Sequence, residues 1–121
     1  MSYVLEFEID ILPRSQINTH GHWRTRAKEK KEIEALVAVY ARPRPKSPLK
    51  RAQLFFTRFS SAEPDFTNLV ASFKGIEDGL VKAGIIEDDC PAVVGHPSYD
   101  WEKARPKHGK VRVIVEEVSD E

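Results

Sequence analysis

The N-terminal segment alternates apolar and polar side chains, and this constrains the fold more than any other feature of the sequence. Every second residue from Tyr3 to Ile11 is apolar, and three of the four residues between them are acidic. A period of two is typical of a β-strand with one buried face. Pro13, which lacks a backbone N–H, ends the pattern. Such a strand has to pair with others and to be covered by a second layer.

Two later segments have the period of 3.6 residues that is typical of amphipathic helices. We expect a helix from about residue 22 to 41 and a second from about 66 to 83, which Gly84 ends. Proline-rich residues 43–48 predict an extended basic connector between them. The apolar stripes are Ile33, Leu36, Val37 and Tyr40 in the first helix, and Leu69, Phe73, Ile76 and Leu80 in the second.

Further strands are predicted at residues 51–59, 92–99 and 110–118, and Ile85-Ile86 favours a short buried strand. A polar stretch, residues 100–109, joins the last two. The order is then β-α-β-α-β-β, which predicts an α+β fold with its helices packed on a mixed β-sheet. We find no internal repeat or domain boundary, so residues 1–121 are expected to form a single domain.

Composition favours a cytoplasmic protein without a membrane segment. Apolar residues make up 40% of the chain, yet no run approaches the roughly 20 residues that span a bilayer. The first residues lack the basic start of a signal peptide. Cys90 is the single cysteine, which excludes an intrachain disulfide and fits a reducing compartment.

Charge is divided unevenly along the chain although the formal net charge is zero. Between Arg14 and Arg58 there are twelve Lys or Arg against three acids, and between Phe59 and Glu102 nine acids against two lysines. The basic part is suited to phosphates and the acidic part to a metal ion. An ordinary domain whose charges balance across its own surface is the alternative.

Acidic residues flank the second predicted helix. Asp65 precedes it, Lys74 and Asp78 lie on it, and Asp88 and Asp89 follow the return through residues 85–86. If the fold brings these positions together, hard oxygen ligands would suit Mg²⁺, and the lysine would neutralise charge on a phosphate. In the structural alternative, Asp65 caps the helix, Lys74 and Asp78 form an i,i+4 pair, and Asp88-Asp89 is a solvated turn.

The same region resembles the RusA-type endodeoxyribonucleases, Holliday junction resolvases that are common in phages and prophages. Their pattern is Asp-x-Asp-Asn-Leu, a lysine further along the helix, Asp-Ala/Gly-Leu, and an apolar pair before Asp-Asp. The matching residues are Asp65-Phe66-Thr67-Asn68-Leu69, Lys74, Asp78-Gly79-Leu80 and Ile85-Ile86-Glu87-Asp88-Asp89. Leu12-Pro13, His22-Trp23-Arg24 and Tyr99-x-Trp101-Glu102-Lys103-Ala104 extend the resemblance over nearly the whole chain.

The resemblance implies a homodimer that binds four-way DNA and cuts two opposed strands with Mg²⁺, in DNA recombination and repair. Asp65, Lys74 and Asp89 match the catalytic residues, and Asp65, Asp88 and Asp89 are the expected metal ligands. A basic helix and connector would hold the phosphate backbones, with dimer geometry giving selectivity for branched DNA. The residues expected to bind DNA are Arg24, Arg26, Lys28, Lys30, Lys31, Arg44 and Lys46.

The chain departs from the family pattern at Thr67, where a second aspartate is expected. A hydroxyl binds Mg²⁺ more weakly than a carboxylate, so Thr67 would weaken catalysis in a protein of this family. Glu63, two residues before Asp65, is an acid that would compensate. Two alternatives to the nuclease therefore stay open. One is a binding protein for branched DNA with a disabled site, and the other is a small interaction module with no role on nucleic acid.

Overall fold

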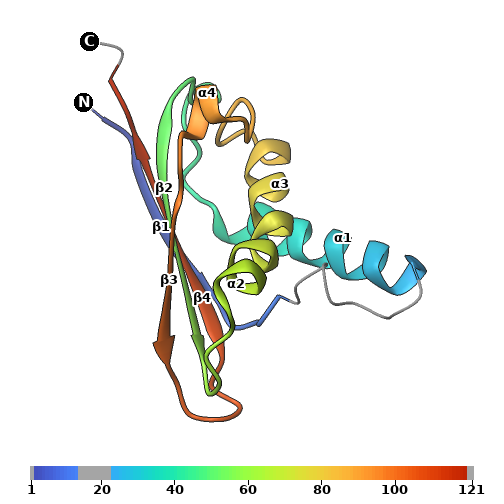
Figure 1. Ribbon diagram of the computed structural model, residues 1–121. Helices are drawn as coiled ribbons and strands as arrows, with labels where there is room; N and C mark the ends of the chain where they lie inside the picture. The colour runs from blue at the N-terminus through green and yellow to red at the C-terminus, as the bar shows by residue number, and fades with distance from the viewer. Residues whose placement is uncertain (1, 14–22, 120–121) are drawn as a thin grey trace.

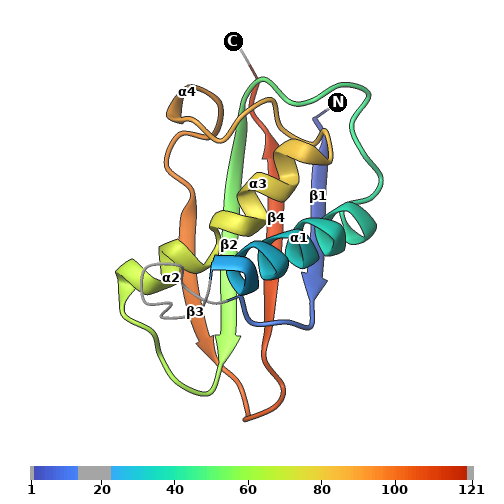
Figure 2. The same cartoon turned by 90° about the vertical axis from the view of Figure 1, so that its right-hand side faces the viewer.

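The computed structural model describes residues 2–13 and 23–119, with side chains from residue 27 onward in the second range. Four strands form a mixed sheet in the order β1-β4-β2-β3, and the helices lie against one face of it (Figures 1 and 2). This confirms the predicted α+β fold. The elements are β1 (Val4–Ile9), α1 (Trp23–Tyr40), β2 (Ala52–Ser60), α2 (Phe66–Ser72), α3 (Lys74–Lys82), α4 (Pro91–Val94), β3 (Ser98–Lys103) and β4 (Lys110–Glu117).

The sheet is antiparallel except at one edge. β4 lies in the middle and pairs antiparallel with β1, where Leu5 faces Val115, and with β2, where Phe56 faces Val113. β3 pairs parallel with β2, and its Tyr99 lies opposite Phe56. A parallel pair needs a crossover connection, which α2, α3 and α4 supply across the helix-covered face.

The core forms between the sheet and the helices, as the two periodicities predicted. The alternate residues Leu5, Phe7 and Ile9 of β1 are buried, and so are all four apolar stripe residues of the second helical segment. Ile33 and Val37 of α1 are buried as well, whereas Tyr40 is 49% exposed, so the apolar stripe of this helix is only partly buried.

One predicted helix, residues 66–83, is two helices that meet at Phe73. The Phe73 ring is fully buried and stacks on Phe56 of the sheet, with ring centroids 4.8 Å apart. α2 ends and α3 begins at this anchor, so Lys74 is the first residue of α3. The periodicity missed the break because the apolar spacing continues through it.

The bounds of the strand predicted at residues 92–99 were also wrong. Residues Pro91–Val94 form the short helix α4, with Pro91 at a helix start, where its missing N–H costs no hydrogen bond. Strand β3 begins only at Ser98 and runs to Lys103, into the stretch expected to be a connection. The predicted Ile85-Ile86 strand is present as a single parallel bridge between Ile86 and Leu49.

Helices α1 and α3 pack closely against each other at two glycines of α3, Gly75 and Gly79. A Cβ added at Gly79 would lie 3.0–3.3 Å from the side-chain carbons of Val37, whereas one at Gly75 would lie 3.5 Å from the nearest carbon of Ile33. The helices therefore approach most tightly at Gly79.

We expect Gly79→Ala to be less stable than Gly75→Ala by about 1–3 kcal/mol in free energy of unfolding. Both variants gain the same helix propensity, so their difference isolates the crowding against Val37. Urea denaturation of the two proteins measures it. Equal stability would show that α1 does not pack on α3 at this distance.

Candidate functional site

Lys74 and Asp89, two of the three predicted catalytic residues, are in direct contact. The Lys74 ammonium donates a hydrogen bond to Oδ2 of Asp89. It also lies 3.2 Å from Oδ1 of Asp78, one turn further along α3. Fifteen residues separate Lys74 from Asp89, so this contact depends on the fold and not on helix spacing alone.

The return of the chain after α3 explains how Asp89 reaches Lys74. Gly84 adopts a left-handed conformation with φ of 78°, which suits a glycine and turns the chain at the end of α3. Ile85 and Ile86 are then buried. Leu49 fixes them, because its N–H donates to the Ile85 carbonyl at 2.9 Å and its carbonyl accepts from the N–H of Glu87 at 3.0 Å.

Charge pairing changes the acidity of both partners. The hydrogen bond to Asp89 raises the pKa of Lys74, and the same bond lowers the pKa of the Asp89 carboxyl. Asp88 supports the arrangement, since its Oδ1 accepts a 2.7 Å hydrogen bond from the N–H of Asp89. Lys74 therefore stays a cation and Asp89 an anion at neutral pH.

Asp65 has a clear structural role at the start of α2. Its Oδ1 accepts from the N–H of Asn68 at 2.9 Å, and its Oδ2 accepts from the Asn68 side-chain amide at 3.0 Å. This is an N-cap, so the helix-capping alternative for Asp65 holds. The predicted convergence of Asp65 with Asp89 on one metal ion stays a prediction.

The donor chemistry fits Mg²⁺ but does not form a closed cage. In the described part of the chain, no three His, Cys, Asp or Glu side chains gather closely enough to hold a metal ion. Mg²⁺ commonly takes one or two protein carboxylates and completes its shell with water and phosphate oxygens. Asp89 and the exposed Asp88 supply that number in one loop.

The basic residues predicted to bind DNA divide into three groups. Lys28, Lys31 and Lys46 are exposed. Lys30 reaches the site, with its ammonium 3.1 Å from Oδ2 of Asp78, and Arg44 donates to the Ala38 carbonyl near the end of α1 at 3.2 Å. The side chains of Arg24 and Arg26 lie outside those that the structure describes.

Sequence reasoning missed two members of this region, Glu77 and Tyr99. Glu77 is only 9% exposed, and its Oε1 accepts a 2.5 Å hydrogen bond from the Tyr99 hydroxyl. Burial raises the pKa of Glu77, although the bond from Tyr99 opposes the shift. The available signal was position: Glu77 is four residues after Phe73 and three before Leu80, on the apolar face of the helix.

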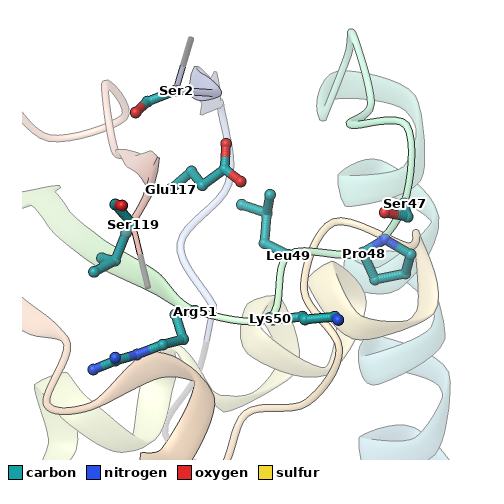
Figure 3. A pocket seen from close by; sticks show the side chains of 9 residues that line it. Ser2, Ser47, Pro48, Leu49, Lys50, Arg51, Glu117 and Ser119 are labelled. Carbon is teal, nitrogen blue, oxygen red and sulfur yellow. The ribbon is translucent and has the colours of Figure 1, made fainter. Parts of the chain in front are cut away.

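A shallow recess of about 230 Å³ joins these residues to the predicted site. Lys74, Glu77 and Tyr99 line it, together with Val70 and Ala71 of α2. A second hollow, of about 510 Å³, lies near the chain ends and includes none of the predicted catalytic or metal-binding residues. Figure 3 shows that its two cations, Lys50 and Arg51, point away from each other, so they do not form a joint anion site.

Comparison with known proteins adds no assignment. No protein-family model matches the chain, and no curated protein matches it. In the described part of the chain, each helix is too short or too polar to span a bilayer.

The capping role of Asp65 gives a stability prediction. Asp65→Ala should lower the free energy of unfolding by about 1 kcal/mol, because the N–H of Asn68 loses its acceptor. Asp65→Asn keeps an acceptor oxygen and should stay close to wild type. Urea denaturation compares the three proteins, and an Asp65→Ala variant as stable as wild type would contradict the capping role.

Proposed function

We propose that the chain is a structure-selective endodeoxyribonuclease that cuts four-way DNA junctions by Mg²⁺-dependent phosphodiester hydrolysis. The observation that carries this proposal is the contact between Lys74 and Asp89, which joins the lysine of the family pattern to the last aspartate of its Asp-Asp pair. The resemblance to the RusA-type enzymes supplies the reaction and the substrate. The protein would act as a cytoplasmic homodimer in DNA recombination and repair.

The residues of the site have complementary roles in this proposal. Asp89 and Asp88, with Asp65, would hold the Mg²⁺ ion, which when bound activates water and stabilises charge on the phosphate. The Lys74 side chain is 54% exposed and its ammonium group contacts Asp78 and Asp89. This ammonium group would neutralise charge on a scissile phosphate.

The charges around Lys74 support a requirement for a cation. Two ammonium groups, Lys30 and Lys74, meet the carboxylates of Asp78 and Asp89, and Glu77 adds a buried acid beside them. Asp88 lies next in the chain. These acids outnumber the two ammonium groups, so a divalent cation would offset the excess negative charge when a phosphate binds.

The basic residues of α1 and the connector extend the site toward DNA. Lys30 is already tied to it through Asp78, and Lys28, Lys31 and Lys46 are exposed for contact with phosphates. Arg44 is partly committed to the end of α1, which makes it the weakest of the DNA-binding candidates with a described side chain. Phosphate contacts of this kind give affinity without base specificity.

A second function keeps DNA binding and loses cleavage. Thr67 is exposed on α2 and offers a hydroxyl where the family pattern has a carboxylate. Together with the absence of a three-acid cluster among the described residues, this favours a catalytically weakened protein that binds branched DNA. The interaction module with no role on nucleic acid has no such observation in its favour.

Cleavage of a labelled four-way junction with and without Mg²⁺ tests the proposal. Wild type should nick the junction only with Mg²⁺, and Asp89→Asn should lose activity by at least 10²-fold while still binding the junction. Glu87→Gln is the matched control, because it removes an exposed acid from the same loop and should cleave like wild type. Binding by wild type without any cleavage would favour the second function, and no binding would exclude both.

Thr67 is tested by restoring the carboxylate. Thr67→Asp should raise Mg²⁺-dependent cleavage by about 10²-fold and lower the Mg²⁺ concentration required, since a charged ligand replaces a neutral one. The double variant with Asp89→Asn should stay inactive. An active wild type that gains nothing from Thr67→Asp would show that another acid already fills this position.

A further inference from the structure

Glu77 is the one charged side chain among the buried residues in the described part of the chain. Burial of a carboxylate is costly unless it is paired or hydrogen-bonded. The bond from Tyr99 meets only part of this cost, because the pKa of Glu77 is still raised by burial. An apolar or amide side chain at this position, between Phe73 and Leu80, would avoid the cost of burying a charge.

Tyr99 holds Glu77 in one orientation. Its ring packs on Phe56, with centroids 5.5 Å apart, and on Phe73 at 6.1 Å, so the hydroxyl is fixed by the core. Burial raises the pKa of Tyr99, which keeps the hydroxyl protonated and able to donate at any ordinary pH. The carboxylate of Glu77, a residue of α3, is thus held in place by Tyr99 of β3.

The anchored carboxylate lies in the same recess as Lys74. Glu77 is three residues after Lys74 on α3, close enough for the two charges to interact, and the charge of Asp89 also reaches it. By contrast, Glu63 is exposed in the turn before α2. Glu77, unlike Glu63, is therefore held beside the Lys74–Asp89 pair.

We propose that Glu77, held by Tyr99, is a positioning residue that supports a divalent cation bound at Asp89 by accepting hydrogen bonds from the water ligands of that ion. The inference rests on the proposed function for the presence of the cation. Carboxylates in this outer position orient metal-bound groups without touching the metal. Mg²⁺ commonly takes only one or two direct carboxylates and keeps several water ligands, which leaves water molecules for Glu77 to orient.

The test measures Mn²⁺ binding to the full chain by isothermal titration calorimetry, without DNA. Glu77→Gln keeps the shape of the side chain and an acceptor for Tyr99, and it should weaken Mn²⁺ binding by about 10-fold or more. Tyr99→Phe keeps the ring but frees the carboxylate, and should weaken binding in the same direction. The control is Glu102→Gln, which removes one exposed acid of β3 and should leave the affinity unchanged.

Thermal unfolding of the same proteins separates this role from a structural one. The raised pKa of Glu77 means that its ionised form disfavours the folded state at neutral pH, so Glu77→Gln should be as stable as wild type or more stable. Weaker Mn²⁺ binding by a protein of undiminished stability is the expected result. Lower stability with unchanged affinity would overturn the proposal.

Asp89→Asn distinguishes failure of this inference from failure of the proposed function. If Asp89→Asn abolishes Mn²⁺ binding while Glu77→Gln binds like wild type, the positioning role is wrong and the cation site stands. If wild type and Asp89→Asn bind Mn²⁺ equally weakly, the cation is not held in this loop and both proposals fail.

Discussion

The stacking of Phe73 on Phe56 fixes the arrangement on which the candidate site depends. It ties the helical layer to the central part of the sheet, and it sets the point where α2 ends and α3 begins. Lys74 follows directly and projects from the first turn of α3, while Ile76 and Leu80 continue into the core. The same aromatic group holds Tyr99, so one packing contact positions both the cation of the site and the donor to Glu77.

The site is a cluster of charges in which carboxylates exceed ammonium groups. Surface ion pairs of this kind contribute little to stability, about 0–1 kcal/mol each. The excess of carboxylates over ammonium groups bears more on function, because it disfavours binding of a phosphate without a cation. A divalent cation changes this balance, and the basic side of α1 is joined to the cluster through Lys30 and Asp78. The geometry thus connects a candidate cation site with a surface suited to phosphates.

Much of the fold was predictable because burial imposes a regular period on the sequence. The alternation in β1, the strand predicted at residues 110–118 and the stripe from Leu69 to Leu80 were confirmed. The break at Phe73 was not predictable, because it results from a contact with a strand distant in sequence and leaves the apolar spacing intact. Likewise, residues 92–99 have an apolar content that suits a strand, yet Pro91 starts a short helix there.

Less of the site could be predicted from residues alone. The resemblance matched Lys74 and Asp89 to catalytic residues without predicting their direct contact, whereas helix spacing accounts only for the pair of Lys74 and Asp78. Asp65 caps α2, as the structural alternative to a metal ligand predicted. Glu77 was missed because helix spacing does not reveal that a charged residue is buried against a strand distant in sequence. Its partner Tyr99 was predicted on a strand with the wrong bounds.

The central claim is that a divalent cation binds beside the Lys74–Asp89 pair. The most direct measurement is paramagnetic broadening of backbone amide NMR signals on titration with Mn²⁺, because it locates the ion without relying on activity. The account predicts that broadening begins at Asp88 and Asp89 and spreads to the first turn of α3, with β1 and the chain ends unaffected at the same concentration. Broadening that begins at the acids of β1 or at Glu116 and Glu117, with the signals of Asp88 and Asp89 unchanged, would contradict it.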